Sequence, residues 1–438
     1  MASFRVIVLG AGPVGLYTAH ALAAAGIDFV VLERQPEVVG YRGAVIFLWP
    51  PFLRLLDQLG MYDAITKVGT QMHGKADFTY KDEPLNRLTL FESLEEKLGY
   101  LSIACSRNQL VRVLYENLPG HKTKVRTSAE AKEIENLKDG VKVHLADGTT
   151  VDGSIVIAAD GVHSLARSFI QRSTAPSGSK PETPMVASFM SIFGRSHPGD
   201  KEVELGWFAE SHGPGVASQS VRCKDALYYT VLAPLPKPTT DRRRFTAEEL
   251  EKLATSLSET TIFPGIRLKE LWSSRDKQNI SLLHQEEGGA DRWYHGRTVI
   301  VGDAAHKMTS VNGQGALQGV LSATNLVNCL YATLRKNPSP NTEELEAAFD
   351  KYQNARQRYV QAVCQFGYER TRIITWADPK IQATDLEETP LRTVEVDVGT
   401  RLMPQMVGCD ILDFVPFESK NGTIPWTKDG KGPIRAQL

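Results

Sequence analysis

The start of the chain follows the hydrophobic pattern of a strand, a helix and a second strand. Residues 4–9 (FRVIVL) are apolar on both faces apart from Arg5, which is typical of a strand buried inside a sheet. Residues 13–26 are rich in alanine and leucine, and Gly26 stands where a helix ends. A second apolar run, IDFVVLER, follows at 27–34. Because two strands joined by one helix need a right-handed crossover, we expect a parallel pair.

Further along the chain, the pattern of buried strands gives way to alternating or aromatic-rich segments and later returns. Buried-strand runs recur at 155–158 (IVIA) and 298–301 (TVIV), and a helical tract is predicted from 316 to about 378 with a break near 336–342. Between the two strand runs, alternating or aromatic-rich segments predict an antiparallel sheet with one face covered: 186–194, 203–209 and 226–235. We therefore expect a mixed α/β (α+β) chain in which a sheet-rich domain is inserted into a discontinuous first domain.

Composition and charge narrow the class of protein. Of the 438 residues, 42% are hydrophobic and 23% are charged, which is ordinary for a soluble globular protein. Fifty basic and fifty-one acidic residues leave a net charge of -1, so no nucleic-acid or anionic-membrane partner is expected. No apolar run approaches the ~18 residues of a membrane-spanning helix. Five scattered cysteines without CxxC pairing indicate neither a disulfide framework nor a metal site, and no secretory signal is recognised, so we expect a cytoplasmic protein.

The first chemical signal is the turn GAGPVG between the first strand and the first helix. Gly10 permits the tight turn, Gly12 lets the backbone approach a pyrophosphate, and Gly15 lets the helix pack closely on the strand. Glu33 ends the second strand, where a carboxylate accepts hydrogen bonds from ribose hydroxyls. The pattern predicts an adenine dinucleotide, either NAD or FAD, and a purely structural glycine turn is the weaker alternative.

The second signal is DGVHSLAR, which follows the apolar run IVIA and opens a helix. Ser164 and Arg167 fall on one helical face, and an arginine there can neutralise the charge of a diphosphate. Taken alone, the pattern is equally compatible with a plain turn at Asp160 and Gly161 and a solvated Arg167.

The third signal is GDAAHKMTSVNGQG, from Gly302 to Gly315. Asp303 follows a buried-strand run, and open α/β sheets bind ligands at the carboxyl ends of their strands. Gly313 and Gly315 lead into a helix that begins near Ala316. The N-terminus of that helix would stabilise negative charge on a ligand oxygen, such as that of an anionic reduced flavin.

These three motifs, in this order and at these separations, resemble the single-component FAD-dependent aromatic monooxygenases, the para-hydroxybenzoate hydroxylase family. The resemblance covers about residues 4–378, and the phrases GDAAHKMT…GQG, LLDQLGMYDAI and TRIITWAD are similar to a fungal branch that oxidises secondary metabolites. It implies a Rossmann-like FAD-binding domain with a parallel sheet, an inserted antiparallel-sheet substrate domain, and C-terminal helices. The expected segments are 1–72, 101–182 and 291–378 for the FAD-binding domain, 73–100 and 183–290 for the substrate domain, and 379–438 as a C-terminal extension.

The resemblance also implies that one extended FAD molecule spans all three motifs. The first motif would hold the adenosine diphosphate, Asp303 the ribityl chain, and the loop before Ala316 the isoalloxazine ring. Arg107 matches the arginine that faces the flavin, and Arg42 lies where the family's backbone contacts it. NAD(P)H would visit transiently to reduce the flavin, with Arg167 taking part. The complete predicted cofactor set is Gly10, Gly12, Pro13, Val14, Gly15, Glu33, Arg34, Arg42, Arg107, Asp160, Gly161, Arg167, Gly302, Asp303, Gly313, Gln314, Gly315 and Ala316.

Some positions depart from the family pattern. Ser310 stands where the family usually has a proline at the reactive edge of the flavin. Since a proline fixes φ and has no N–H, the serine predicts a more flexible loop with an extra donor. Leu317 and Ser322 replace an asparagine and an acidic residue of the following helix, and Met190 replaces an arginine found in the fungal branch. These departures concern oxygen transfer rather than FAD binding.

The resemblance implies a monooxygenase that uses NAD(P)H and dioxygen to hydroxylate or epoxidise an aromatic or polyunsaturated natural product through a flavin C4a-hydroperoxide. Its partners would be dioxygen and a small hydrophobic or aromatic substrate, with the protein a monomer or a homodimer. Arg42, His306 and Ser310 are the candidate catalytic residues, although for His306 a structural role with a satisfied hydrogen bond is the favoured alternative. Two rival functions stay open: a flavoenzyme of this fold without oxygen insertion (an oxidase or a cyclase), and a non-catalytic escort protein.

Overall fold

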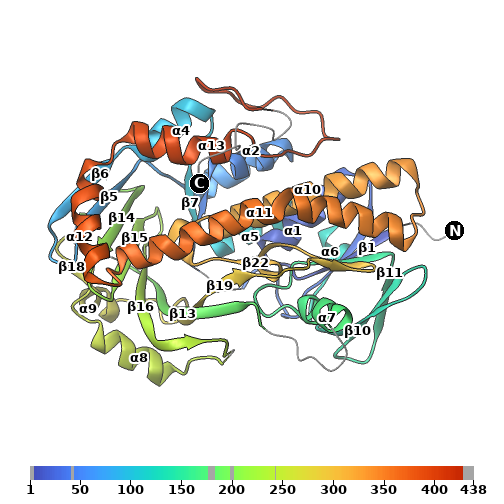
Figure 1. Cartoon of the computed structure of the whole chain (residues 1–438), viewed down its shortest axis with the longest axis horizontal. Coiled ribbons are helices and arrows are strands. Elements are labelled where there is room, and N and C mark those ends of the chain that lie inside the picture. The colour runs from blue at the N-terminus through green and yellow to red at the C-terminus, as the bar shows by residue number, and fades with distance from the viewer. Residues whose placement is uncertain (1–3, 41–43, 176–182, 198–201, 242, 428–438) are drawn as a thin grey trace.

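A computed structural model of the chain describes residues 4–40, 44–175, 183–197, 202–241 and 243–427. Figure 1 shows two sheet regions, with the long helix α11 running from one to the other and α10 packed beside it. The expected strand–helix–strand unit is present, since β1 (Arg5–Leu9) and β2 (Asp28–Leu32) pair in parallel and α1 (Pro13–Ala24) connects them. The mixed α/β fold class predicted from the sequence is therefore confirmed.

The first sheet has six strands in the order β20-β21-β12-β1-β2-β8. Its strands are parallel except for the antiparallel pair of β20 and β21. β12 lies between β1 and β21, so three strands that are far apart in the sequence end at one edge. Beyond β1 and β2, the strands are β8 (Val125–Arg126), β12 (Ile155–Ala158), β20 (Tyr294–His295) and β21 (Thr298–Ile300).

The second sheet has eight strands in the order β22-β19-β13-β16-β15-β14-β5-β6. It is antiparallel as predicted, with the exception of β5, which pairs in parallel with β14. The pair of β5 and β6 comes from residues 74–88 and extends a sheet whose other strands all lie beyond residue 184. The strands are β5 (Gly74–Thr79), β6 (Pro84–Leu88), β13 (Met185–Ser196), β14 (Trp207–His212), β15 (Ala217–Arg222), β16 (Leu227–Thr239), β19 (Ser281–Gly289) and β22 (His306–Lys307).

The other strands of the described residues form three small sheets. The sequence pattern did not predict the sheet of β3, β7 and β4, which lies at the site. β3 (Val45–Leu48), β7 (Ile103–Ser106) and β4 (Thr70–Gln71) pair antiparallel. β7 leads directly into α5, and Ser106 with Gln109 forms a capping box at the start of that helix. The other two comprise β9 (Ala131–Asn136), β10 (Val141–Leu145) and β11 (Thr150–Gly153), and β17 (Thr261–Phe263) with β18 (Ile266–Arg267).

The predicted helical tract forms two helices, α10 (Gly315–Lys336) and α11 (Thr342–Ile374), with the break where it was expected. Asn341 caps α11 by accepting a hydrogen bond from the Glu344 N–H. None of the helices in the described part of the chain combines the length and apolar character that a membrane span requires. The remaining helices are α2 (Pro50–Gln58), α3 (Tyr62–Val68), α4 (Leu90–Leu98), α5 (Arg107–Glu116), α6 (His121–Lys124), α7 (Leu165–Thr174), α8 (Ala247–Ser256), α9 (Leu268–Ser273), α12 (Pro379–Glu388), the π-helix Glu395–Leu402 and α13 (Met403–Met406).

A buried ionic cluster ties α11 and α12 to the second sheet. His212 on β14 is fully buried, and its Nδ1 lies 2.6 Å from Asp385 Oδ2 of α12. Its Nε2 lies 3.1 Å from Glu210 Oε1, which also accepts a hydrogen bond from Arg370 of α11. Burial alone would lower the pKa of His212, but its contacts with Asp385 and Glu210 raise it. Burial would raise the pKa of Asp385, but His212 and other donors lower it to about 2.

The same cluster includes a potential ligand set for a metal ion. One ligand atom from each of Asp77, Glu210 and His212 lies within 4.8 Å of the others. Lys75 Nζ is 2.8 Å from Asp77 Oδ1 and 2.9 Å from Glu210 Oε1, and Arg370 also pairs with Glu210. Because these cations already neutralise the carboxylates, the group is an ion-pair cluster.

We expect Asp385→Asn to lower the free energy of unfolding by about 3 kcal/mol, because it removes one partner of a buried ion pair. Because the pKa of His212 is raised, the stability that its charged form gives to the fold is lost as pH rises through the pKa of the folded state. Because the pKa of Asp385 is lowered, the stability that its charged form gives is lost as pH falls towards about 2. The effect should therefore be largest between about pH 4 and about pH 6.5.

Denaturant unfolding across the pH range measures this difference. Asp350→Asn, at an exposed position of α11, is the control and should have little effect at any pH. A loss of stability in Asp385→Asn that stays constant across the range would contradict the assignment.

Candidate cofactor and substrate site

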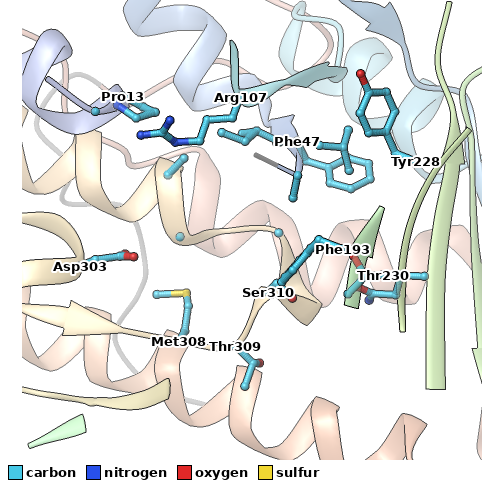
Figure 2. A pocket seen from close by; sticks show the side chains of 18 of the residues that line it. Pro13, Phe47, Arg107, Phe193, Tyr228, Thr230, Asp303, Met308, Thr309 and Ser310 are labelled. Atoms are coloured by element: carbon cyan, nitrogen blue, oxygen red, sulfur yellow. The ribbon is translucent and has the colours of Figure 1, made fainter. Parts of the chain in front are cut away.

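The loops that follow β1, β12 and β21 open into one cavity of about 350 Å³. Each loop contributes lining residues, among them Gly12, Gly161 and Asp303. The start of α10 completes this end, while β3 and strands of the second sheet line the other end. In Figure 2, Pro13 and Arg107 lie at one end of the cavity, and Tyr228 and Thr230 lie at the other. The structure thus brings together three motifs that are separated by almost three hundred residues.

The first loop has the close packing that its glycines predict. Gly10 has a φ of +94°, in the region that favours glycine. A Cβ at Gly15 would lie 1.9 Å from the carbonyl oxygen of Gly10, so no larger residue fits there without moving the backbone. α1 begins after Gly12 with no side-chain cap and no acidic residue in its first turn. Its N–H groups and positive dipole end are therefore available to an anionic ligand, and Pro13 and Val14 line the cavity beside them.

Glu33 lies against this loop. Its Oε2 accepts a hydrogen bond of 2.8 Å from the Ala11 N–H, and its Oε1 accepts one of 2.9 Å from the Gln35 N–H. Glu33 and the exposed Arg34 are not among the residues that line the described cavity. Their assignment to the adenosine end of a cofactor stays a prediction.

The second loop shows contacts that the motif alone did not reveal. Asp160 Oδ2 accepts hydrogen bonds from the N–H groups of Leu165 and Ala166, so this carboxylate caps α7, and burial raises its pKa. Arg167 is 1% exposed and donates to the carbonyl oxygens of Ala304, at 2.8 Å, and of Val162.

That Arg167 neutralises a diphosphate stays a prediction. Arg167 is not among the residues that line the cavity, and its guanidinium donates hydrogen bonds to backbone carbonyls. A fully buried guanidinium needs such acceptors, and here they join the second loop to the third. Gly161, by contrast, does line the cavity.

The third loop places Asp303 and the start of α10 at the cavity. Asp303 Oδ2 forms an ion pair of 3.0 Å with Lys307 Nζ, and both residues line the cavity. Gly302 and Gly313 have φ values of +62° and +61°, where glycine is favoured. α10 follows the buried Gln314 without a side-chain cap or an acidic residue in its first turn, so a second helix N-terminus faces the same cavity. At the start of α10, Gly313, Gly315 and Ala316 line the cavity.

His306 matches the structural alternative at one ring nitrogen only, because its buried Nδ1 has no hydrogen-bond partner among the described residues, and its catalytic role stays a prediction. It is 2% exposed, its Nε2 lies 3.2 Å from Ser322 Oγ, and its ring is 5.5 Å from that of Trp293. Burial, together with the nearby positive charge of Arg356, lowers its pKa to about 3. The imidazole is therefore neutral at physiological pH, and it does not belong to the described lining of the cavity.

The two arginines predicted near the flavin have different outcomes. Arg107 is the first residue of α5, where the Ser106 capping box holds the helix start, and it lines the cavity. A Cβ at Gly12 would lie 3.5 Å from Arg107 Nη2, which places the guanidinium beside the first loop. Arg42 lies outside the described residues, so its predicted roles in cofactor binding and catalysis stay predictions.

The far end of the cavity is an uncharged lobe, rich in aromatic residues, that is built on the second sheet. Here Phe47 of β3 meets Phe208 of β14 edge to face, with ring centroids 5.2 Å apart. Tyr228 and Tyr229 of β16 line this lobe. No side chain of the lobe carries a formal charge at neutral pH. Its residues are Ile46, Phe47, Phe193, Phe208, Gln219, Ser220, Val221, Tyr228, Tyr229, Thr230 and Ser310.

Of the departures from the family pattern, only Ser310 lines the described cavity. Leu317 is buried in the main core, Ser322 contacts His306, and Met190 packs in the core beneath the second sheet. The Ser310 N–H donates to Gln285 Oε1 at 2.9 Å, so the extra donor is satisfied, and the expected loose loop is instead anchored. The buried Ser310 Oγ has no hydrogen-bond partner within the described part of the chain.

A parallel sheet whose loops and two uncapped helix N-termini surround one cavity, continuous with an uncharged aromatic lobe, defines a nucleotide-binding enzyme site. The FAD-binding-domain family matches residues 3–367, and the chain belongs to this family. The FAD-dependent monooxygenase srdH of Neurospora crassa is 35% identical over 444 residues, covering 97% of this chain and 99% of that protein. The FAD-dependent monooxygenase ptmM of Penicillium ochrochloron is 31% identical, over 87% of this chain and 90% of that protein.

Solved structures share the fold. The crystal structure of HpxO from Klebsiella pneumoniae complexed with FAD and uric acid has a TM-score of 0.74 at 24% identity, over 90% of this chain and 95% of that chain. The structure of CtdE in complex with FAD and substrate has a TM-score of 0.70 at 16% identity, over 86% of this chain and 90% of that chain.

We expect Gly15→Ala to weaken FAD binding by about tenfold or more, equivalent to about 1.4 kcal/mol. The added methyl group would displace the Gly10 carbonyl and with it the loop at the start of α1. Retained FAD is measured from the visible absorbance of the purified protein. Gly399→Ala is the control, because a Cβ there has no atom within 4 Å and φ is not positive. Equal FAD retention in the two variants would contradict the placement of the first loop.

Proposed function

We propose that this protein is an FAD-dependent monooxygenase that uses NAD(P)H and dioxygen to hydroxylate or epoxidise an aromatic or polyunsaturated natural product. One observation carries the proposal: a single cavity joins the three loops of the parallel sheet to an uncharged aromatic lobe. The full-length similarity to fungal proteins named FAD-dependent monooxygenases supports it. Because the lobe lacks charged side chains, the favoured substrate is neutral and hydrophobic.

The residues at the cavity fit FAD. Gly12 lines the cavity, where the absence of a side chain lets a pyrophosphate approach the backbone, and the N-terminus of α1 with Arg107 suits its charge. Asp303 offers acceptors for the hydroxyl groups of a ribityl chain. The N-terminus of α10 offers N–H donors to a ring oxygen. Bound FAD would supply the redox and oxygen chemistry.

The chain itself would bind, orient and exclude water. The aromatic lobe would desolvate the substrate and hold it beside the loop of Ser310. In the overall reaction, one oxygen atom of dioxygen enters the substrate, the other leaves as water, and NAD(P)H provides two electrons. Arg107 is the cation that would balance the charge of the pyrophosphate.

Ser310 also motivates a second candidate, a flavoenzyme of the same fold that oxidises or cyclises its substrate without inserting oxygen. The serine adds a hydroxyl at the position that the family usually gives to proline, and Ser310 is one of the residues that line the cavity. A product mass measured after reaction under isotopically labelled dioxygen separates the two functions. Incorporation of one labelled atom with substrate-stimulated NAD(P)H oxidation supports the monooxygenase, and product formation without label supports the second candidate.

We expect Asp303→Ala to lose most of its FAD, because it removes the carboxylate at the carboxyl end of β21. Asp28→Ala is a matched control, since Asp28 also pairs with a lysine and has a similarly exposed side chain, 37% against 39% for Asp303. Asp28 starts β2 and so lies at the opposite edge of the same sheet. Isothermal titration of FAD into each apoprotein gives the comparison, and unchanged affinity in Asp303→Ala would refute its role.

A further inference from the structure

The loop that carries Ser310 is held at three consecutive residues by three different elements. Thr309 Oγ1 lies 2.9 Å from Thr371 Oγ1 and donates to the Gly367 carbonyl, both on α11. The Ser310 N–H donates to Gln285 Oε1 of β19 at 2.9 Å, and Gln219 Nε2 of β15 donates to the Val311 carbonyl, also at 2.9 Å. Figure 2 shows Ser310 on this loop between Thr309 and the lobe residues Phe193 and Thr230.

The orientation of the Gln219 amide is determined by its surroundings. Its Nε2 donates to the Val311 carbonyl and, at 2.6 Å, to Glu210 Oε2. A backbone carbonyl and a carboxylate accept hydrogen bonds only, so the NH₂ group must face both. Glu210 is 1% exposed, and although burial would raise its pKa, Arg370 and Lys75 hold it well below its usual value. An ionised carboxylate in the ion-pair cluster therefore orients the glutamine that holds the loop.

The geometry at Ser310 is one that proline also adopts. Ser310 is the first residue of a short 3₁₀ turn, Ser310–Asn312, and proline is favoured at the first position of a helical turn. Thr309 before it is extended, with φ of −58° and ψ of 157°, as a residue preceding proline must be. A proline would restrict this backbone and remove the N–H. In this chain Gln285 satisfies that N–H, and Gln219 restrains the next carbonyl.

We propose that Gln285 and Gln219 are positioning residues that together replace a loop proline, holding residues 309–311 where the cofactor loops meet the aromatic lobe. The glutamines come from β19 and β15 of the second sheet, so the walls of the substrate lobe and the loop beside the cofactor move as one unit. This proposal rests on the proposed function in one respect, which is that FAD and the substrate are the ligands that meet beside this loop.

The test compares Gln285→Leu and Gln219→Leu with Gln58→Leu in the FAD-loaded protein. Gln58 is a matched control, because it is 7% exposed like Gln219 and its Nε2 also donates to two acceptors, the carbonyls of Leu412 and Val415. All three variants should lose thermal stability. Only the two loop variants should shift the visible spectrum of bound FAD and weaken FAD binding by about fivefold or more, the effect of an unpaired buried polar group.

A double variant makes the test specific to the missing proline. Ser310→Pro removes the N–H that Gln285→Leu leaves unpaired, so it should restore the spectrum and FAD affinity of Gln285→Leu to within about twofold of the wild type. It should not restore Gln219→Leu, where a carbonyl has lost its donor. If Gln285→Leu does not fold, recovery of folded protein by Ser310→Pro supports the proposal equally well.

Two results would overturn the proposal: loop variants that match Gln58→Leu in spectrum and FAD affinity, or a Ser310→Pro change that rescues neither or both loop variants alike. These measurements do not require turnover. A wild-type protein that binds FAD but shows no substrate-stimulated NAD(P)H oxidation would refute the proposed function and leave this test intact. Where turnover is observed, the loop variants should also release a larger share of the NAD(P)H electrons as hydrogen peroxide.

Discussion

The pairing of β12 between β1 and β21 brings the carboxyl ends of three strands to one edge of a sheet, although the strands are drawn from residues 5–9, 155–158 and 298–300. The loops that follow them form the nucleotide end of the cavity. Their arrangement depends on close packing: Gly15 sits against the Gly10 carbonyl, and the buried Arg167 bonds to carbonyls of the second and third loops. The guanidinium therefore contributes to the site by holding two loops together.

The cavity separates charged from uncharged residues. Its charged lining residues, Arg107, Asp303 and Lys307, lie among the loops of the parallel sheet, whereas the lobe on the second sheet is aromatic and neutral. Close behind that lobe, Glu210 and His212 belong to an ion-pair cluster whose charges compensate one another. The proposed function uses this arrangement to hold an anionic dinucleotide and a desolvated hydrophobic substrate in one continuous cavity.

The loop of residues 309–311 is held by side chains that are remote from it in the sequence. Ser310 provides a donor and a freedom of φ that a proline would not. Gln285 and Gln219, from two strands of the second sheet, supply the acceptor and the restraint that the loop lacks. In the proposed arrangement, the two glutamines hold the conformation of the loop, and each of the backbone groups that they contact keeps a partner.

The sequence by itself determined those helices and strands whose hydrophobic period and terminal residues lie within a few positions of one another. The strand–helix–strand unit, the glycine turns and the break between α10 and α11 follow from patterns within a few residues. That the three motifs belong to one site was implied by their resemblance to a known family, and the parallel sheet brings the three loops to one edge. Only the tertiary structure decided which side chains of a motif face the cavity. Arg167 and His306 stand in the right motifs but are buried with other partners, and Phe47 and Gln219 reach the cavity from strands with no motif. Burial and partner choice depend on residues that are remote in sequence, and no local pattern encodes them.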